Sequence, residues 1–261
     1  MNQGFGVAAG LDPEVARPLA ARCVELGYGS MWSNDHPGAK GLETLAEFAA
    51  AAPSTDLGVA VIALDRQSPD EIAADIERLS LDPKRLWLGV GAGFSKKPLT
   101  RMHESLPELR EKLPGVRLIL AAMGPKMCAL AGAEFDGAFF NWMTPEFATQ
   151  ARERVEAGAR DAGRNTPAVF GYVRTAIGPD AAERLAKEES FYRDLHDGYR
   201  NHFARLGGEL EGTVGVAAAD RDAAQSQLAP YTALDTVVVR GLASASVESM
   251  TALATAAAPG K

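Results

Sequence analysis

Short runs of apolar, often β-branched residues alternate with longer amphipathic stretches from one end of the chain to the other. The short runs predict β-strands, and the longer ones predict helices with one apolar face. Strands are expected at 5–8, 29–33, 57–64, 86–91, 116–121, 137–141, 168–174 and 236–240. Helices are expected at 13–26, 42–52, 69–79, 102–113, 125–133, 145–162, 181–206, 216–228 and 244–257. Such an alternation is typical of βα units, and eight of them predict a (β/α)8 TIM barrel with a parallel sheet.

Prolines and glycines at the boundaries of these stretches agree with the predicted helices. Pro69, Pro125 and Pro145 each stand at the first turn of an expected helix, and Gly27 ends the first one. Because no linker, repeat or low-complexity stretch interrupts the chain, residues 1–261 are expected to form one domain. The segment 191–212 is the least regular, and we expect a helix there that covers the barrel mouth.

Composition narrows the class of protein. The chain is 46% hydrophobic and 23% charged, with a net charge of −7, which is typical of a globular protein and argues against a nucleic-acid partner. Two cysteines in helical stretches argue against a disulfide framework, and His196 and His202 are not spaced to share a metal. No stretch has the pattern of a signal peptide or a membrane span. A cytoplasmic enzyme or binding protein is therefore expected.

Candidate chemistry lies in the loops that follow the strands, since barrel enzymes draw their reacting groups from those loops. The loop after the second strand carries Asn34, Asp35 and His36. Histidine is the side chain best suited to exchange a proton near neutral pH. The alternative is that Asn34 or Asp35 caps a turn and that His36 is merely exposed.

Basic residues gather in the same loops although the chain as a whole is acidic. They are Arg66, Lys96, Lys97, Arg101 and Lys126. A basic mouth favours an anionic ligand, although loop lysines can also be simply solvated. Gly124 and Pro125 lead directly into an expected helix, so the free amides there could bind a phosphate, with Lys126 adding a charge. The alternative is an ordinary turn before a helix that starts with proline.

Three glycines, Gly89, Gly91 and Gly93, end the fourth strand and allow the backbone to approach a flat ligand. They do not form a dinucleotide-binding fingerprint, because Phe94 occupies the place of the required third glycine. A serine-hydrolase elbow is also missing from the sequence. The loops therefore favour a ligand held across a barrel mouth over a Rossmann fold.

Several of these segments, taken in order, resemble the luciferase-like superfamily, and in particular its branch that depends on the deazaflavin coenzyme F420. The matching segments are 25–37, 57–61 with Arg66 and Pro69, 88–93, 121–127 and 131–146, and the strand at 236–240 fits the last one of the family. The resemblance spans about residues 4 to 175. Each segment alone is short, and it is their combination and order that is specific.

The resemblance implies a coenzyme that lies across the mouth with its ring over the end of the third strand. Members of the family often have a non-prolyl cis peptide there, which would fall at about Ala60–Val61. It further implies that His36 exchanges the proton that accompanies hydride transfer, with Asp35 or Asn34 holding its ring or a neighbouring water. The residues expected to contact the coenzyme are Asn34, Ala60, Val61, Arg66, Gly91, Gly93, Ala122, Met123, Gly124, Pro125, Lys126 and Asn141.

The sequence also departs from relatives that act on sugar phosphates. Phe94 and Ser95 stand where those enzymes have a glutamate, and Asn141 begins the stretch where they have a lysine. A phosphorylated sugar is therefore not the expected substrate. We expect an oxidoreductase that transfers a hydride between F420 and a small organic substrate, in a homodimer such as relatives commonly form. The alternatives are a monooxygenase that depends on flavin mononucleotide (FMN) and an inactive barrel that binds an anionic ligand.

Overall fold

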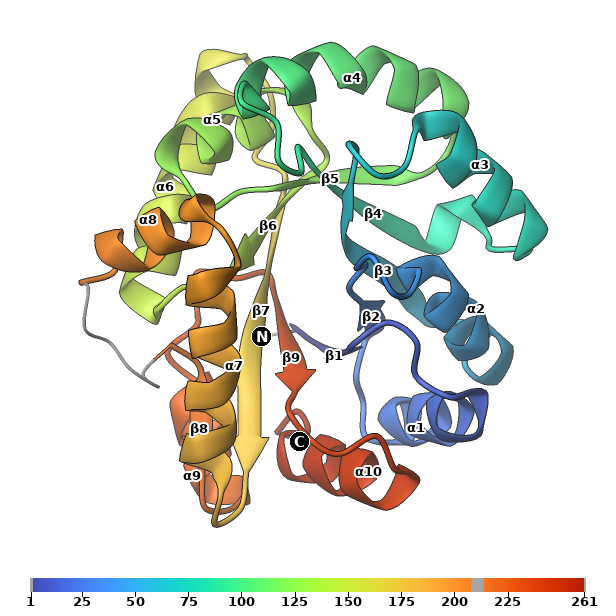
Figure 1. Ribbon diagram of the computed structural model, residues 1–261, viewed down its shortest axis with the longest axis vertical. Helices are drawn as coiled ribbons and strands as arrows, with labels where there is room; N and C mark the ends of the chain where they lie inside the picture. The colour runs from blue at the N-terminus through green and yellow to red at the C-terminus, as the bar shows by residue number, and fades with distance from the viewer. Residues whose placement is uncertain (1, 208–213, 261) are drawn as a thin grey trace.

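The computed structural model describes residues 2–207 and 214–260. Its parallel strands close into a barrel, as the alternating pattern predicted, because β7 pairs with both β6 and β9 and β9 pairs with β1. The barrel strands are β1 (Asn2–Val7), β2 (Ser30–Ser33), β3 (Asp56–Ala63), β4 (Leu86–Gly91), β5 (Arg117–Ala121), β6 (Gly137–Asn141), β7 (Ala168–Ile177) and β9 (Thr236–Gly241). Figure 1 shows this ring of strands with helices around it.

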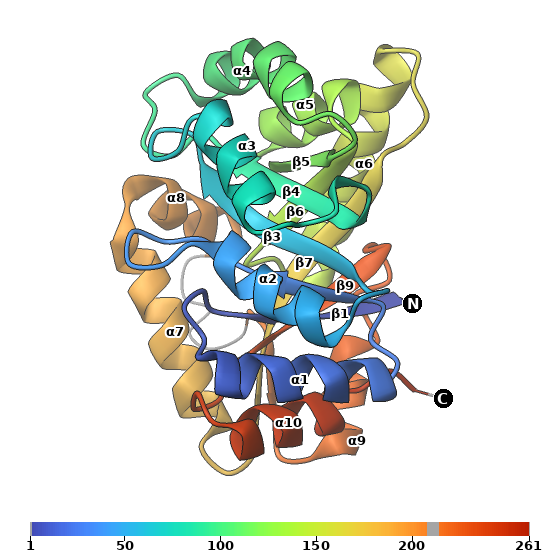
Figure 2. The same cartoon turned by 90° about the vertical axis from the view of Figure 1, so that its right-hand side faces the viewer.

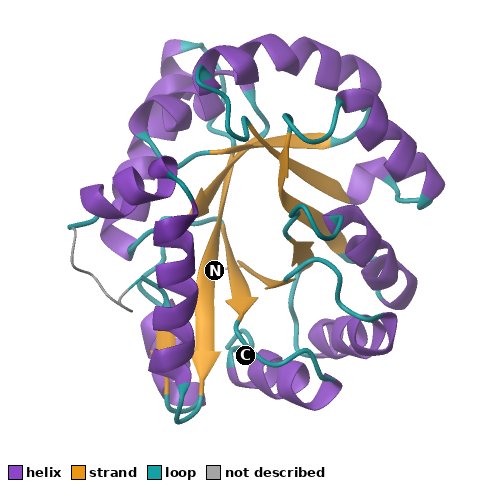
Figure 3. Ribbon diagram, in the orientation of Figure 1, coloured by secondary structure: helices purple, strands orange, loops and turns teal. Residues whose placement is uncertain are grey.

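The helices surround the strands, and Figure 3 separates the two layers by colour. They are α1 (Pro13–Glu25), α2 (Gly41–Ala51), α3 (Pro69–Arg78), α4 (Pro98–Lys112), α5 (Pro125–Glu134), α6 (Pro145–Asp161), α7 (Ala181–Leu195), α8 (Asp197–Arg205), α9 (Arg221–Leu228) and α10 (Val247–Ala256). Pro69, Pro125 and Pro145 start their helices as predicted. No helix in the described part of the chain is long and apolar enough to cross a membrane.

The region between β7 and β9 differs from the prediction. The expected helix at 216–228 is a short strand, β8 (Val216–Ala218), followed by α9, which starts after Asp220 caps the amide of Ala223. β8 pairs in parallel with the outer end of β7, where Thr175 lies opposite Val216. A pairing between positions 41 residues apart leaves no local pattern, so the short run could not be distinguished from a helical turn.

The expected helix at 181–206 is likewise two helices. The break lies at His196, whose backbone is extended and whose Nδ1 accepts a hydrogen bond of 2.9 Å from the amide of Gly198. The ring therefore caps α8 and turns the chain between α7 and α8. Part of the segment expected to cover the barrel mouth, residues 208–212, lies outside the described residues.

Aromatic side chains fill the middle of the barrel. Trp32, Phe139, Phe170 and Tyr172 are buried together, and Trp32 lies 5.2 Å, centroid to centroid, from both phenylalanine rings. A Cβ placed on Gly58 would come within 2.1 Å of the Trp32 ring, so that glycine makes the packing possible. Because side chains fill the middle of the barrel, a ligand cannot enter it, and the loops at the carboxyl ends of the strands are the place where barrel enzymes bind their ligands.

Helices α5 and α6 pack with their backbones in close approach. A Cβ on Gly132 would lie 1.9 Å from the carbonyl oxygen of Val155, and one on Gly158 would lie 2.1 Å from that of Ala129. Two small residues thus allow the two helices to touch directly. This contact fixes the position of α5, whose first turn lies at the rim.

Candidate active site at the barrel rim

The loop after β2 is held by side-chain hydrogen bonds to three other segments. The Asn34 Oδ1 accepts a bond of 2.9 Å from the amide of Ala9, which ties this loop to the loop after β1. The Asp35 carboxylate accepts one bond of 3.0 Å from the Gly41 amide and another of 2.9 Å from the Arg66 guanidinium. Its side chain is only 5% exposed. Asp35 and Arg66, both predicted for the site, are thus in contact and fix each other's position.

His36 lies exposed at the tip of the same loop. Its backbone closes a tight turn with Ala39 through two reciprocal bonds of 3.2 and 3.1 Å. Its Nδ1 accepts a bond of 3.1 Å from the amide of Gly38. In the neutral ring this assigns the proton to Nε2, which is the nitrogen left to act towards a ligand.

The cis peptide expected near the end of the third strand is present, and a bulge accompanies it. The peptide bond between Ala60 and Val61 is cis, and the register of β3 with β4 shifts between Val59 and Ile62. A Cβ on Gly89 would come within 2.6 Å of the Val59 carbonyl oxygen. The glycine of β4 thus leaves the space that the bulge occupies.

Gly91 and Gly93 play different parts at the end of β4. A Cβ on Gly91 would lie 3.2 Å from Val61, an approach that a small shift could relieve. Gly93 has a φ of +59°, and a Cβ there would lie 1.8 Å from the Asp65 carboxylate. That carboxylate accepts a bond of 2.9 Å from the Phe94 amide, so Gly93 lets the loops after β3 and β4 join.

The first turn of α5 is open at its N-terminus. Gly124 occupies the cap position with an extended backbone and provides no side-chain hydrogen bond. The nearest atom to a Cβ placed on it would be an Arg205 guanidinium nitrogen of α8, at 4.0 Å. Lys126 follows, exposed, while Ala122 is buried and its amide is bonded to the Phe139 carbonyl oxygen at 3.0 Å. Two basic side chains therefore flank an uncapped helix N-terminus.

Helix α8 lies over the ends of the strands, on the side of the molecule where the loops after β2, β3 and β4 gather (Figure 2). The Tyr199 hydroxyl accepts a hydrogen bond of 3.1 Å from the side-chain Nδ2 of Asn141, at the end of β6. His202 donates a bond of 2.6 Å from its Nε2 to the Trp142 carbonyl oxygen, and burial lowers the pKa of this imidazole. Residues 191–207, the described part of the segment 191–212, thus cover the barrel mouth as expected.

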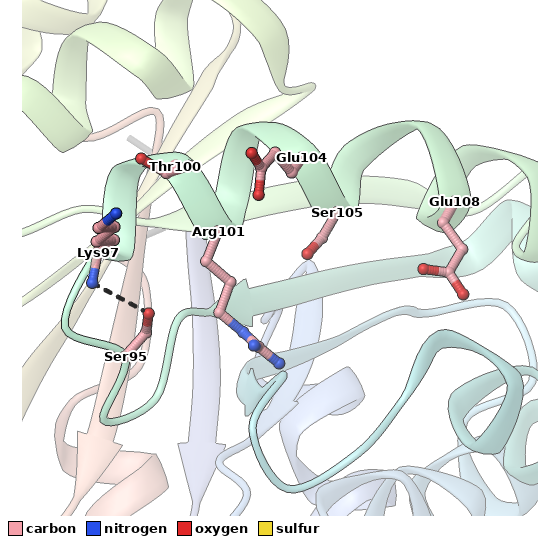
Figure 4. Close-up of a pocket in the computed structure, with 7 residues that line it drawn as sticks. All are labelled: Ser95, Lys97, Thr100, Arg101, Glu104, Ser105 and Glu108. Atoms are coloured by element: carbon pink, nitrogen blue, oxygen red, sulfur yellow. Dashed lines mark hydrogen bonds between the residues drawn. The ribbon is translucent and has the colours of Figure 1, made fainter.

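A hollow of about 320 Å³ opens beside the start of α4 (Figure 4). It is lined by Ser95, Lys97, Thr100, Arg101, Glu104, Ser105 and Glu108. Arg101 donates a hydrogen bond to the Leu64 carbonyl oxygen, and the lining holds two acidic and two basic side chains. Of the expected basic set, Arg66 is paired with Asp35, whereas Lys96 and Lys126 are exposed.

The comparison with protein-family models decides the family. The model described as luciferase-like monooxygenase matches residues 105–255, which is more than half of the chain. The chain belongs to the luciferase-like monooxygenase family. This luciferase-like protein is also 27% identical, over 194 residues, to 5,10-methylenetetrahydromethanopterin reductase of Methanolobus tindarius. The matched region covers 60% of each of the two chains.

Solved structures share the barrel of this luciferase-like protein. An F420-dependent secondary alcohol dehydrogenase, in complex with an F420-acetone adduct, matches with a TM-score of 0.74 and 17% identity over 98% of both chains. The F420-dependent tetrahydromethanopterin reductase of Methanopyrus kandleri matches with a TM-score of 0.72 and 16% identity over 98% of this chain and 96% of its own. The oxygenating constituent of 3,6-diketocamphane monooxygenase from Pseudomonas putida, in complex with FMN, matches at 0.61 and 17% identity over 99% of both. These likenesses establish the fold.

Two arginines at the rim of this luciferase-like protein escaped the sequence reasoning. Arg174 lies three residues before the end of β7 and Arg240 one residue before the end of β9. The two lie opposite each other in register and are 2% and 7% exposed. The Arg174 guanidinium donates to the Asn141 side-chain oxygen and lies 4.3 Å from the centre of the Trp142 ring. The sequence carried only a weak signal. Each arginine stands two positions after an inward-facing residue, Tyr172 or Val238, but the sequence does not show which face of the strand points inward.

Proposed function

We propose that this protein is an oxidoreductase that transfers a hydride between the deazaflavin coenzyme F420 and a small organic substrate. The coenzyme supplies the redox chemistry when it is bound, and the protein positions it and admits the substrate. The similarity to the Methanolobus tindarius reductase supports this choice. So does the fold shared with two F420-dependent enzymes.

The observation that carries the proposal is the first turn of α5. Amides in the first turn of a helix have no partner within that helix, and the helix dipole favours an anion there. In the part of the chain that the structure describes, no side chain caps this turn, and Arg205 and Lys126 add positive charge beside Gly124. These residues fit a phosphate, and we assign the phosphate of the coenzyme to them.

The loop after β2 supplies the proton in this proposal. The Gly38 amide holds Nδ1 of His36, so the neutral ring carries its proton on Nε2. We assign to Nε2 the proton that the substrate gains or loses. Asp35 is already occupied by Gly41 and Arg66, and its part is to hold the loop rather than to move the proton.

An FMN-dependent monooxygenase is the second candidate. It is favoured by the description of the family and by the shared fold with the Pseudomonas putida enzyme bound to FMN. FMN also carries a phosphate, so the α5 turn fits both coenzymes. The two candidates therefore differ in the coenzyme that the protein prefers, which a direct measurement can decide.

The test is a calorimetric titration of the purified protein with F420 and, separately, with FMN. We expect F420 to bind more tightly. Gly124→Val should weaken that binding by at least about tenfold, the loss of one or more charge-assisted hydrogen bonds. The variant should fold normally, because the nearest atom to its Cβ is a flexible guanidinium end at 4.0 Å.

Gly29→Val is the matched control. Gly29 precedes β2 at the opposite end of the barrel, and a Cβ there would lie 3.8 Å from the nearest atom, a backbone oxygen. Its coenzyme affinity should equal that of the unmodified protein. Tighter binding of FMN would favour the monooxygenase, and saturation by neither coenzyme would favour an inactive barrel. Unchanged affinity in folded Gly124→Val would remove the α5 turn from the site.

A further inference from the structure

The proposed function assigns no role to the pair of arginines on β7 and β9, Arg174 and Arg240. Arg174 and Arg240 are register partners on adjacent parallel strands. Both are in phase with side chains of the barrel interior, Tyr172 and Val238. Two guanidinium groups therefore lie side by side inside the mouth, beneath α7 and α8.

Both guanidinium groups have neutral hydrogen-bond partners. Within residues 2–207 and 214–260, no acidic side chain lies within 4.0 Å of either one. Arg174 donates to the neutral Asn141 side-chain oxygen, and Arg240 donates to the Gly241 carbonyl oxygen at 2.9 Å. Glu188 of α7 acts on Arg240 only through space. Buried charges are normally paired, so two adjacent cations with neutral partners are costly.

The electrostatics of the pair also indicate positive charge that is not compensated. Burial lowers the pKa of Arg240, and the charge of Arg174 lowers it further. Arg174 is partly stabilised by the faces of Trp142 and Tyr192, whose ring centres lie 4.3 and 4.8 Å from its guanidinium carbon. Ring faces lessen the cost of the charge without neutralising it. The pair therefore keeps an excess of positive charge in a place shielded from water.

Neighbouring donors also lack acceptors. The Trp142 indole nitrogen, the Tyr172 hydroxyl and the Arg174 Nε are buried and make no hydrogen bond within the described structure. Tyr172 feels the charges of both arginines. A buried donor without an acceptor costs about 1–3 kcal/mol. Each of these three groups could donate to one anion, and an oxyanion offers enough lone pairs to accept from several donors.

We propose that Arg174 and Arg240, with the Tyr172 hydroxyl and the Trp142 indole, bind an oxyanion group of the substrate, a carboxylate or a phosphate. The planar fork of each guanidinium matches two oxygens of such a group. The assignment to the substrate rests on the proposed function, which gives the phosphate of the coenzyme to the first turn of α5. The α5 turn follows β5, whereas the arginines lie on β7 and β9, so the two anion sites are built from different strands.

The test uses sodium malonate and inorganic phosphate as probes, with sodium chloride at equal ionic strength as the reference. A ligand that binds only the folded protein raises the thermal unfolding midpoint as its concentration rises. We expect one or both probes to raise the midpoint of the unmodified protein above that in chloride. In the Gly124→Val background, where the α5 turn no longer takes the probe, Arg240→Met should lose this rise, and calorimetry should show an affinity at least about tenfold weaker.

The variant is expected to fold. Replacing a buried, poorly paired charge by an apolar side chain of similar size is often neutral or stabilising. Without either probe, the midpoint of Arg240→Met should therefore equal or exceed that of the unmodified protein. Arg240→Gln, which keeps two donors but no charge, provides a second variant. Arg160→Met, at an exposed arginine in the last turn of α6, is the matched control and should keep the full response.

Three outcomes would overturn the proposal. The first is that neither probe stabilises the unmodified protein more than chloride does. The second is that Arg160→Met loses the response to the probes as Arg240→Met does. The third is that Arg240→Met loses F420 affinity but keeps its response to both probes. The third outcome would mean that the two arginines bind the coenzyme rather than the substrate. If F420 does not bind the unmodified protein but the anion response still depends on Arg240, the oxyanion site stands and the proposed function fails.

Discussion

Asp35 provides a direct test of whether the loop after β2 is held as described. In Asp35→Ala, the Gly41 amide at the start of α2 loses its acceptor, which costs about 1 kcal/mol for a helix cap. The hydrogen bond to Arg66 is charge-assisted and worth about 1.5–3 kcal/mol. The Arg66 side chain is 31% exposed, so solvent screening reduces that value. The expected total is about 2–3 kcal/mol of unfolding free energy, or about 5–10 °C in the thermal midpoint.

Urea denaturation followed by circular dichroism measures this loss, with Glu153→Ala as a control at an exposed position of α6. Asp35→Asn keeps an oxygen for the Gly41 amide but loses the charge, so its loss should be about 1 kcal/mol. F420 affinity should fall in Asp35→Ala and be largely retained in Asp35→Asn. A loss below about 0.5 kcal/mol in Asp35→Ala, the range of ordinary surface substitutions, would refute the structural role of this carboxylate.

Three further predictions concern other parts of the molecule. His36→Ala should lower turnover about 10²–10⁴-fold with coenzyme affinity nearly unchanged, and full activity in steady-state kinetics would exclude it as proton donor. Because burial lowers the pKa of His202, the unfolded chain binds a proton that the folded one does not, so stability should fall as pH drops through about 6.5. His202→Gln should flatten this dependence in thermal scans at several pH values, and an unchanged slope would contradict the assignment. Gly158→Ala should cost at least about 1–3 kcal/mol in urea denaturation, because its Cβ would lie 2.1 Å from the Ala129 carbonyl oxygen, and a silent substitution would contradict the α5–α6 contact.

The sequence alone was sufficient to predict the barrel, because each βα unit carries its own local pattern. Apolar runs mark the strands, and residues such as Pro69 and Pro125 mark the starts of helices. The position of the cis peptide at Ala60–Val61 was also predicted, although from the resemblance to a family rather than from local pattern. Local signals and family motifs together were therefore sufficient to predict most of the architecture and the cis peptide at the rim.

Features that depend on distant pairings could not be predicted. β8 exists only because β7 extends to Ile177 and offers it an edge. Arg174 and Arg240 look like ordinary strand ends until the register of β7 with β9 brings them together. The contact of Asp35 with Arg66 likewise joins two loops that were predicted for the site separately. Their chemistry is decided by which residues become neighbours, and this information is spread over the whole chain.

The pairing of β7 with β9 gives the molecule a modular construction. These strands bond directly to each other, so the barrel closes independently of α7, α8 and β8, which are attached to the outer end of β7. The chain between 178 and 218 can therefore be exchanged as a cassette, with β8 restoring the connection on the same edge. A chimera that receives this cassette from a relative should keep its barrel and change the substrates that it accepts, and it should keep its coenzyme affinity only where the incoming segment retains a cation at the place of Arg205.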